Sequence, residues 1–174
     1  TLADATQNEA VSWGSAAANP PTTIGNAGGG SVARAAAGTF TAGALDGRAF
    51  VHDGSTLMML DGPGSIAYGV RADGVAVGQD ANGAAVVFNG IHAGPLASSG
   101  TAWAILGEQV VGSRDDDNGD QQAFLATLGA GLVDLFAGVA FDLNGSGDVV
   151  GADFTTGVAM LFDDGQAYNL NSLV

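Results

Sequence analysis

The sequence predicts an all-β fold, a small β-propeller of four-stranded antiparallel blades. Three observations support this: a repeat of about 37 residues, several short apolar runs within each repeat, and glycine-containing turns between the runs. The turns are mostly Asp-Gly and Asn-Gly, dipeptides that accept the positive φ of tight hairpins. Apolar runs of three to five residues leave no room for a helix of ordinary length.

The repeat has two markers that stay in step along the chain. The first is an alanine beside apolar residues, spaced roughly 36 to 39 residues apart, at Ala10, Ala49, Ala85, Ala123 and Ala159. The second ends in glycine and reads Thr41-Ala42-Gly43, Ala76-Val77-Gly78, Val110-Val111-Gly112 and Val149-Val150-Gly151. We therefore expect one repeat domain over residues 1–174, with units at 9–47, 48–83, 84–121 and 122–157.

Each unit divides into four strand-like segments. In the second unit we expect them at Ala49–His52, Thr56–Leu60, Ser65–Arg71 and Val75–Gln79. The dipeptides Asp53-Gly54, Asp61-Gly62 and Asp73-Gly74 separate them. Four strands in about 40 residues are typical of a propeller blade.

The two ends of the chain predict ring closure. Residues 158–174 supply two further strands, and Thr1–Ala5 aligns with Val150–Phe154. Residues 158–174 together with 1–8 would form a composite closing blade, which removes exposed strand edges and gives about five blades. The alternative is a β-solenoid, which stacks its units linearly and requires caps.

The clearest copy of the repeat runs from Gln122-Ala123-Phe124-Leu125 through Leu132-Val133-Asp134-Leu135 to Val149-Val150-Gly151. This pattern resembles the bacterial extracellular repeat family called HAF. The resemblance covers nearly the whole chain, although no unit has the histidine that precedes Ala-Phe in the family pattern. It implies secretion and a repeat architecture.

Composition restricts the partners. Cysteine and lysine are absent, and the four arginines, Arg34, Arg48, Arg71 and Arg114, face 18 acidic residues, so the formal net charge is −14. Nucleic acids and anionic membrane surfaces bind through cations, so we expect neither as a partner. No apolar run is long enough to insert into a membrane. Thr1–Gly14 has no signal-peptide pattern, so we expect a mature chain that is extracellular or on the cell surface.

Two acidic segments are calcium candidates. Asp142, Asn144, Ser146 and Asp148, with Asp153 in the twelfth position, reproduce the spacing of a calcium-binding loop. The alternative is a plain turn, which Asn, Gly and Ser favour without a metal. Asp115 and Asp117 lie in an acidic loop that could hold Ca²⁺ weakly or simply be solvated.

Aromatic residues recur at matching positions. Tyr68 and Trp103 follow the alanines of Ile66-Ala67-Tyr68 and Thr101-Ala102-Trp103. We expect them to pack between blades, with a glycan-stacking platform as the alternative.

No residue pattern indicates an enzyme. The serines lack a nucleophile elbow, the glycines lack a phosphate loop, and His52 and His92 lack zinc-ligand spacing. The sequence therefore predicts a non-enzymatic binding or scaffold module for an extracellular glycan or protein. The alternatives are a structural subunit that self-assembles into a surface filament by strand pairing between chains, and a glycosidase-like propeller.

Overall fold

The computed structural model describes residues 10–12, 22–24 and 30–172. The chain folds into four successive four-stranded antiparallel sheets, preceded by the hairpin of β1 (Ala10–Ser12) and β2 (Thr22–Ile24). Within each sheet, the strands are hydrogen-bonded in chain order. A single short helical turn, η1 (Leu170–Ser172), follows the last strand of the described residues. No helix in this described part could cross a membrane.

The sheets are numbered I to IV along the chain. Sheet I contains β3 (Ser31–Ala37), β4 (Phe40–Leu45), β5 (Arg48–His52) and β6 (Leu57–Met59). Sheet II contains β7 (Ile66–Val70), β8 (Ala76–Gln79), β9 (Ala85–Asn89) and β10 (His92–Ala97). Sheet III contains β11 (Thr101–Leu106), β12 (Gln109–Asp115), β13 (Gln121–Thr127) and β14 (Gly131–Ala137). Sheet IV contains β15 (Val139–Leu143), β16 (Val149–Asp153), β17 (Val158–Asp163) and β18 (Gln166–Asn169).

The all-β prediction is confirmed, and the four strands expected in the second unit correspond to β5, β6, β7 and β8. The hydrogen-bonded sheets group these strands in another phase. The last two strands of one sequence unit, such as β7 and β8, pair with the first two of the next, β9 and β10. A periodic sequence can be divided at any phase, so the markers alone do not locate the sheet boundary.

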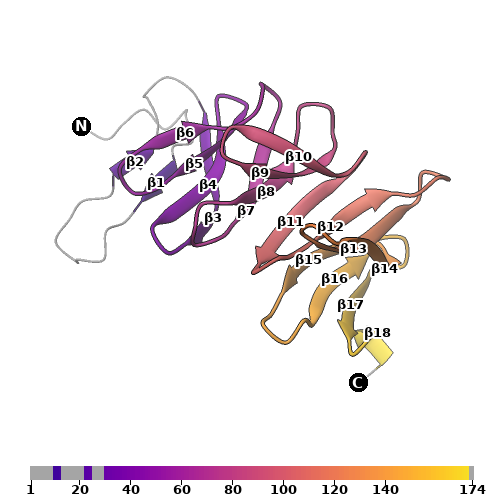
Figure 1. The fold of residues 1–174 in the computed structure, drawn as a ribbon. Coiled ribbons are helices and arrows are strands. Elements are labelled where there is room, and N and C mark those ends of the chain that lie inside the picture. The colour runs from indigo at the N-terminus through magenta and orange to yellow at the C-terminus, as the bar shows by residue number, and fades with distance from the viewer. Residues whose placement is uncertain (1–9, 13–21, 25–29, 173–174) are drawn as a thin grey trace.

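The four sheets lie in a row, with the β1–β2 hairpin at one end and β18 at the other (Figure 1). They do not close into a ring within the described residues. The expected closing strand, Thr1–Ala5, lies outside those residues. Sheet IV already has four strands, because β17 pairs with β16 and β18 pairs with β17.

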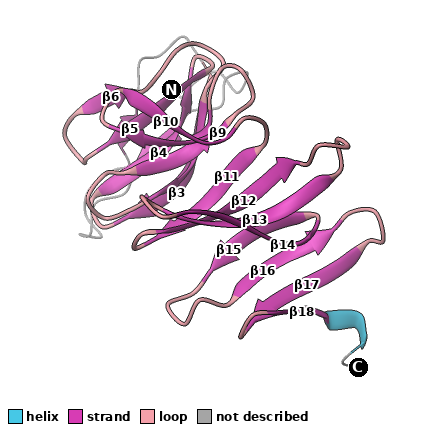
Figure 2. Ribbon diagram, turned by 45° about the vertical axis from the view of Figure 1, so that its right-hand side comes forward, coloured by secondary structure: helices cyan, strands magenta, loops and turns pink. Residues whose placement is uncertain are grey.

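Neighbouring sheets lie against one another (Figure 2), and buried apolar side chains fill the space between them. The first strand of each sheet lies against the first three strands of the preceding one: β7 packs on β3, β4 and β5, and β11 and β15 repeat the arrangement. The largest side chains in these layers are Phe88 between sheets I and II, Phe124 between II and III, and Phe136 between III and IV. Each fully buried side chain of this size contributes roughly 1.5–3 kcal/mol.

A β-bulge in the first strand of every sheet faces a glycine in the second strand. The facing pairs are Ala33–Gly43, Ala67–Gly78, Ala102–Gly112 and Ala140–Gly151, and in each case the register shifts just after the alanine. A Cβ on any of these glycines would collide with a carbonyl oxygen of the first strand. The second sequence marker therefore ends in glycine because the bulge brings two backbones too close for a side chain.

A backbone hydrogen bond joins each sheet to the next. The N–H of Gly64, Gly100 or Gly138, just before the incoming first strand, donates to a carbonyl oxygen at the start of the preceding sheet's third strand. The acceptors are Gly47 at 2.6 Å, Gly83 at 2.9 Å and Gln121 at 2.8 Å, respectively. The three glycines have φ values of 94°, 108° and 126°, which other residues rarely adopt.

We expect Gly112→Ala to lower the free energy of unfolding by about 1–3 kcal/mol, because the new Cβ would overlap the Thr101 carbonyl oxygen and lie 2.9 Å from the Ala102 Cα. Urea denaturation monitored by circular dichroism measures the change. Gly145→Ala is the matched control, since nothing lies within 4 Å of its Cβ position. Equal stability of the two variants would contradict the bulge geometry.

Candidate functional site

The bulges place one side chain from each sheet in a continuous line. The bulge residues are Arg34, Tyr68, Trp103 and Phe141. The Tyr68 and Trp103 ring centroids lie 4.4 Å apart, and those of Trp103 and Phe141 lie 6.1 Å apart. Phe154, just after β16, extends the line at 6.0 Å from Phe141. We call these four rings the aromatic stripe.

A cation ends the stripe. The Arg34 guanidinium carbon lies 4.9 Å from the Tyr68 ring centroid, so sheet I contacts the ring of sheet II. A guanidinium within about 6 Å of a ring centroid is attracted by the negative face of the ring. The stripe and Arg34 thus connect all four sheets.

The stripe is partly open to solvent. Tyr68 and Trp103 are half-buried, whereas Phe141 is 41% exposed and Phe154 is 64% exposed. The indole nitrogen of Trp103 is buried without a hydrogen-bond partner. Buried donors are normally satisfied, so this N–H is an unusual polar group beneath an otherwise apolar surface.

The expectation that Tyr68 and Trp103 pack between neighbouring sheets is confirmed by their ring contact. Sequence reasoning missed Phe141, Phe154 and Arg34 as members of the same line. The sequence did contain a signal for Phe141, because Val139-Ala140-Phe141 matches the pattern around Tyr68 and Trp103. Phe154 had no such signal, since it lies outside the bulge position.

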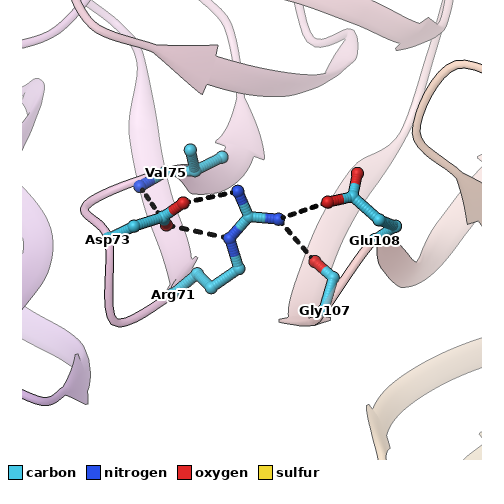
Figure 3. Close-up of polar contacts among 5 residues, drawn as sticks. All are labelled: Arg71, Asp73, Val75, Gly107 and Glu108. Atoms are coloured by element: carbon cyan, nitrogen blue, oxygen red, sulfur yellow. Dashed lines mark hydrogen bonds and ion pairs between the residues drawn. The ribbon is translucent and has the colours of Figure 1, made fainter.

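A polar clamp joins sheets II and III (Figure 3). Arg71 binds both carboxylate oxygens of Asp73, with Nε–Oδ1 2.8 Å and Nη2–Oδ2 2.6 Å. Its Nη1 donates to the Gly107 carbonyl at 2.6 Å and to Glu108 Oε1 at 3.2 Å, in the β11–β12 turn. One guanidinium therefore connects the turns of two sheets.

The clamp shifts the pKa values of Arg71 and Asp73. Hydrogen bonds from Arg71 lower the pKa of Asp73 to about 2. The same contact with Asp73, followed by the charge of Glu108, raises the pKa of Arg71. Asp73 therefore remains ionised to low pH.

A groove of about 540 Å³ lies between sheets II and III beside the clamp, and Arg71 and Glu108 are among its lining residues. The rest of the lining is mainly apolar and includes Val87, Leu96 and Leu132. This size is within the usual range of ligand pockets. The Arg71 guanidinium is already engaged by Asp73, Gly107 and Glu108, so it is not free to bind a ligand in the groove.

The first calcium candidate forms a hydrogen-bonded turn. Asn144 Oδ1 accepts from the backbone N–H groups of Ser146 and Asp148, and its side-chain amide donates to Asp148 Oδ2 at 2.6 Å. Asp142 accepts from the Leu143 N–H. Asp153 accepts from the Thr155 and Thr156 N–H groups of the β16–β17 turn. Asn144 and Asp153 thus each organise a turn of their own.

The second calcium candidate is also organised as a turn. Asp116 Oδ1 accepts from the N–H groups of Asp120 and Asn118, which lower the pKa of Asp116. Asp115 ends β12 and Asp117 is exposed in the following loop. Within the described ranges, no three His, Cys, Asp or Glu side chains are grouped closely enough to hold a metal. Calcium binding stays a prediction.

The comparisons with known proteins add no relative: no family model, no curated protein and no solved structure matches this chain. The resemblance to HAF repeats therefore stays a prediction.

We expect Asp73→Asn to flatten the loss of stability in acid. The folded-state pKa of Asp73 is lowered to about 2, below its ordinary value of 3.8, so its contribution to stability is complete above pH 3.8 and is lost as the pH falls toward 2. Urea midpoints at pH 6 and pH 2.5 measure this. The wild-type midpoint should fall further between the two pH values than that of Asp73→Asn.

The control is Asp117→Asn, which also removes one negative charge but breaks no clamp contact. It should follow the wild type. If Asp73→Asn and Asp117→Asn showed the same pH dependence, the clamp would not be formed in solution.

Proposed function

We propose that this chain is a non-enzymatic, extracellular or cell-surface β-repeat module that binds its partner along the aromatic stripe. The observation that carries the proposal is the continuous line of Tyr68, Trp103, Phe141 and Phe154 across three sheets. Contiguous exposed aromatic side chains are uncommon on surfaces that bind nothing and are enriched in interfaces. The stripe is therefore the surface on which we place the ligand.

The chemistry of the stripe suits an extracellular glycan or a protein segment. Ring faces offer apolar contact to sugar C–H groups or to flat side chains, and the exposed Arg34 offers hydrogen-bond donors at one end. The row of four sheets makes the surface long and narrow, which fits an extended ligand better than a compact one.

Charge argues for a partner other than nucleic acid. Two of the four arginines are held in ion pairs, Arg71 with Asp73 and Glu108, and Arg114 with Asp134. Few cations remain to neutralise phosphates on a chain with a net charge of −14.

The acidic side chains support a binding role over an enzymatic one. Asp53, Asp80, Asp116 and Asp153 each accept backbone N–H groups within turns. Carboxylates used in this way stabilise turn geometry and are poorly placed to share a proton across a cleft.

We further propose that the sheets are blades of a propeller of about five, with an open β-solenoid as the alternative. Four antiparallel strands per sheet and the packing of each first strand on the preceding sheet support either architecture.

The second candidate function is a structural subunit that polymerises by strand pairing between chains. The edge strand β18 favours it, because all four of its residues are exposed and it contains neither lysine nor proline. Such an edge lacks the usual protection against pairing with another chain. By contrast, the edge strand β10 contains Pro95, and β6 has only three residues.

We expect Phe154→Ser to weaken ligand binding at least tenfold, because it removes the most exposed ring of the stripe. The measurement is binding of the purified chain to a panel of bacterial and host polysaccharides and extracellular matrix proteins by biolayer interferometry. Val133→Ser is the matched control, since Val133 is 59% exposed but lies on β14 outside the stripe. Equal binding by the two variants, or no binding by the wild type across the panel, would contradict the proposal.

A further inference from the structure

Among the residues that the structure describes, the outward face of sheet IV is apolar and partly exposed to solvent. Val150, Leu161 and Tyr168 lie directly opposite one another on β16, β17 and β18, so they share one face of the sheet. Val150 is 45% exposed and Tyr168 is 37% exposed. The opposite face carries Val149, Met160 and Phe162, which pack against sheet III.

The same positions are buried in the other three sheets. By the repeat, Val150 corresponds to Ala42, Val77 and Val111, each of which has no exposed surface. Ala159 is exposed, whereas its counterparts Ala49, Ala85 and Ala123 are completely buried. The composition of the face is thus that of an internal layer, although nothing described covers it.

The structure also indicates what covers such a face. In sheets I, II and III, the first strand of the next sheet covers this face. That strand brings a completely buried alanine into the layer, which is Ala67, Ala102 or Ala140, respectively. A glycine before that strand donates its N–H to a carbonyl oxygen just before or at the start of the third strand. In sheet IV, the corresponding carbonyl is that of Gly157, the residue before β17.

We propose that the outward face of sheet IV is a docking site for one more unit of this repeat. The incoming unit begins with glycine, an apolar residue or threonine, alanine and an aromatic residue, as at 100–103 and 138–141. Its alanine packs on Val150 and Ala159, and its glycine N–H donates to Gly157. The inference goes beyond the proposed ligand site, since it concerns the face of β16, β17 and β18 that carries Val150, Leu161 and Tyr168.

The small residues of this face explain why a strand of the repeat, and not another element, would pack on it. The layers between sheets pair small residues with small residues where the backbones approach, as Ala102 does with Val77 and Ala85. A helix or a bulky side chain could not approach Ala159 in this way, whereas a bulged strand that carries alanine can. The fit is therefore specific to a strand of the repeat.

The test uses a single thiol as a probe of burial, because the chain has no cysteine. Ala159→Cys is prepared in the full chain and in an extended chain in which residues 138–174 are repeated once after Val174. The rate of labelling by a maleimide is compared at native conditions. We expect the added unit to slow labelling of the thiol at least tenfold.

Two controls exclude indirect effects. Val133→Cys, on an exposed position of sheet III, should label equally fast in both chains. An extended chain with Ala140→Asp in the appended copy should lose the protection, because a carboxylate would enter the layer. Equal labelling of Ala159→Cys with and without the intact added unit would overturn the proposal, whatever the stripe binds.

Discussion

The close approach of two backbones at Gly43, Gly78, Gly112 and Gly151 is the constraint on which the rest of the structure depends. Each glycine allows a bulge in the facing first strand, since any side chain there would overlap a carbonyl oxygen. The bulge adds one unpaired residue and turns its side chain away from the regular alternation. That residue is Arg34, Tyr68, Trp103 or Phe141, so one backbone device repeated in every sheet produces the line of side chains.

The sheets stack mainly because apolar side chains are buried between them. Phe50, Phe88 and Phe124 are essentially inaccessible, and each fills a different layer between neighbouring elements. The Arg71 clamp and the Arg114–Asp134 pair are partly solvent-exposed, and such pairs contribute little to stability on their own. Their role is to fix turns and register, while the apolar layers and the inter-sheet glycine hydrogen bonds hold the row together.

The strands and turns could be predicted because alternating apolar runs and Asp-Gly or Asn-Gly pairs are local signals. The grouping of strands into sheets could not, because pairing β8 with β9 is a nonlocal choice that the period alone does not determine. A signal did exist in Gly64, Gly100 and Gly138, whose positive φ marks the entry to each new sheet. Local chemistry also marks the turns at Asn144 and Asp153, since each side chain accepts backbone N–H groups of its own turn.

The bulge in sheet III is most directly tested by nuclear Overhauser contacts between β11 and β12 in the full chain. The account predicts that Gly112 contacts Ala102 and that Val111 contacts Ala104, with Trp103 left out of the pairing and its ring against Tyr68. Contacts from Val111 to Trp103 in place of Ala104 would mean an unbroken ladder. That result would contradict the account, because Gly112 would then face no bulge. The side chains of the stripe would also no longer share the bulge position that aligns them.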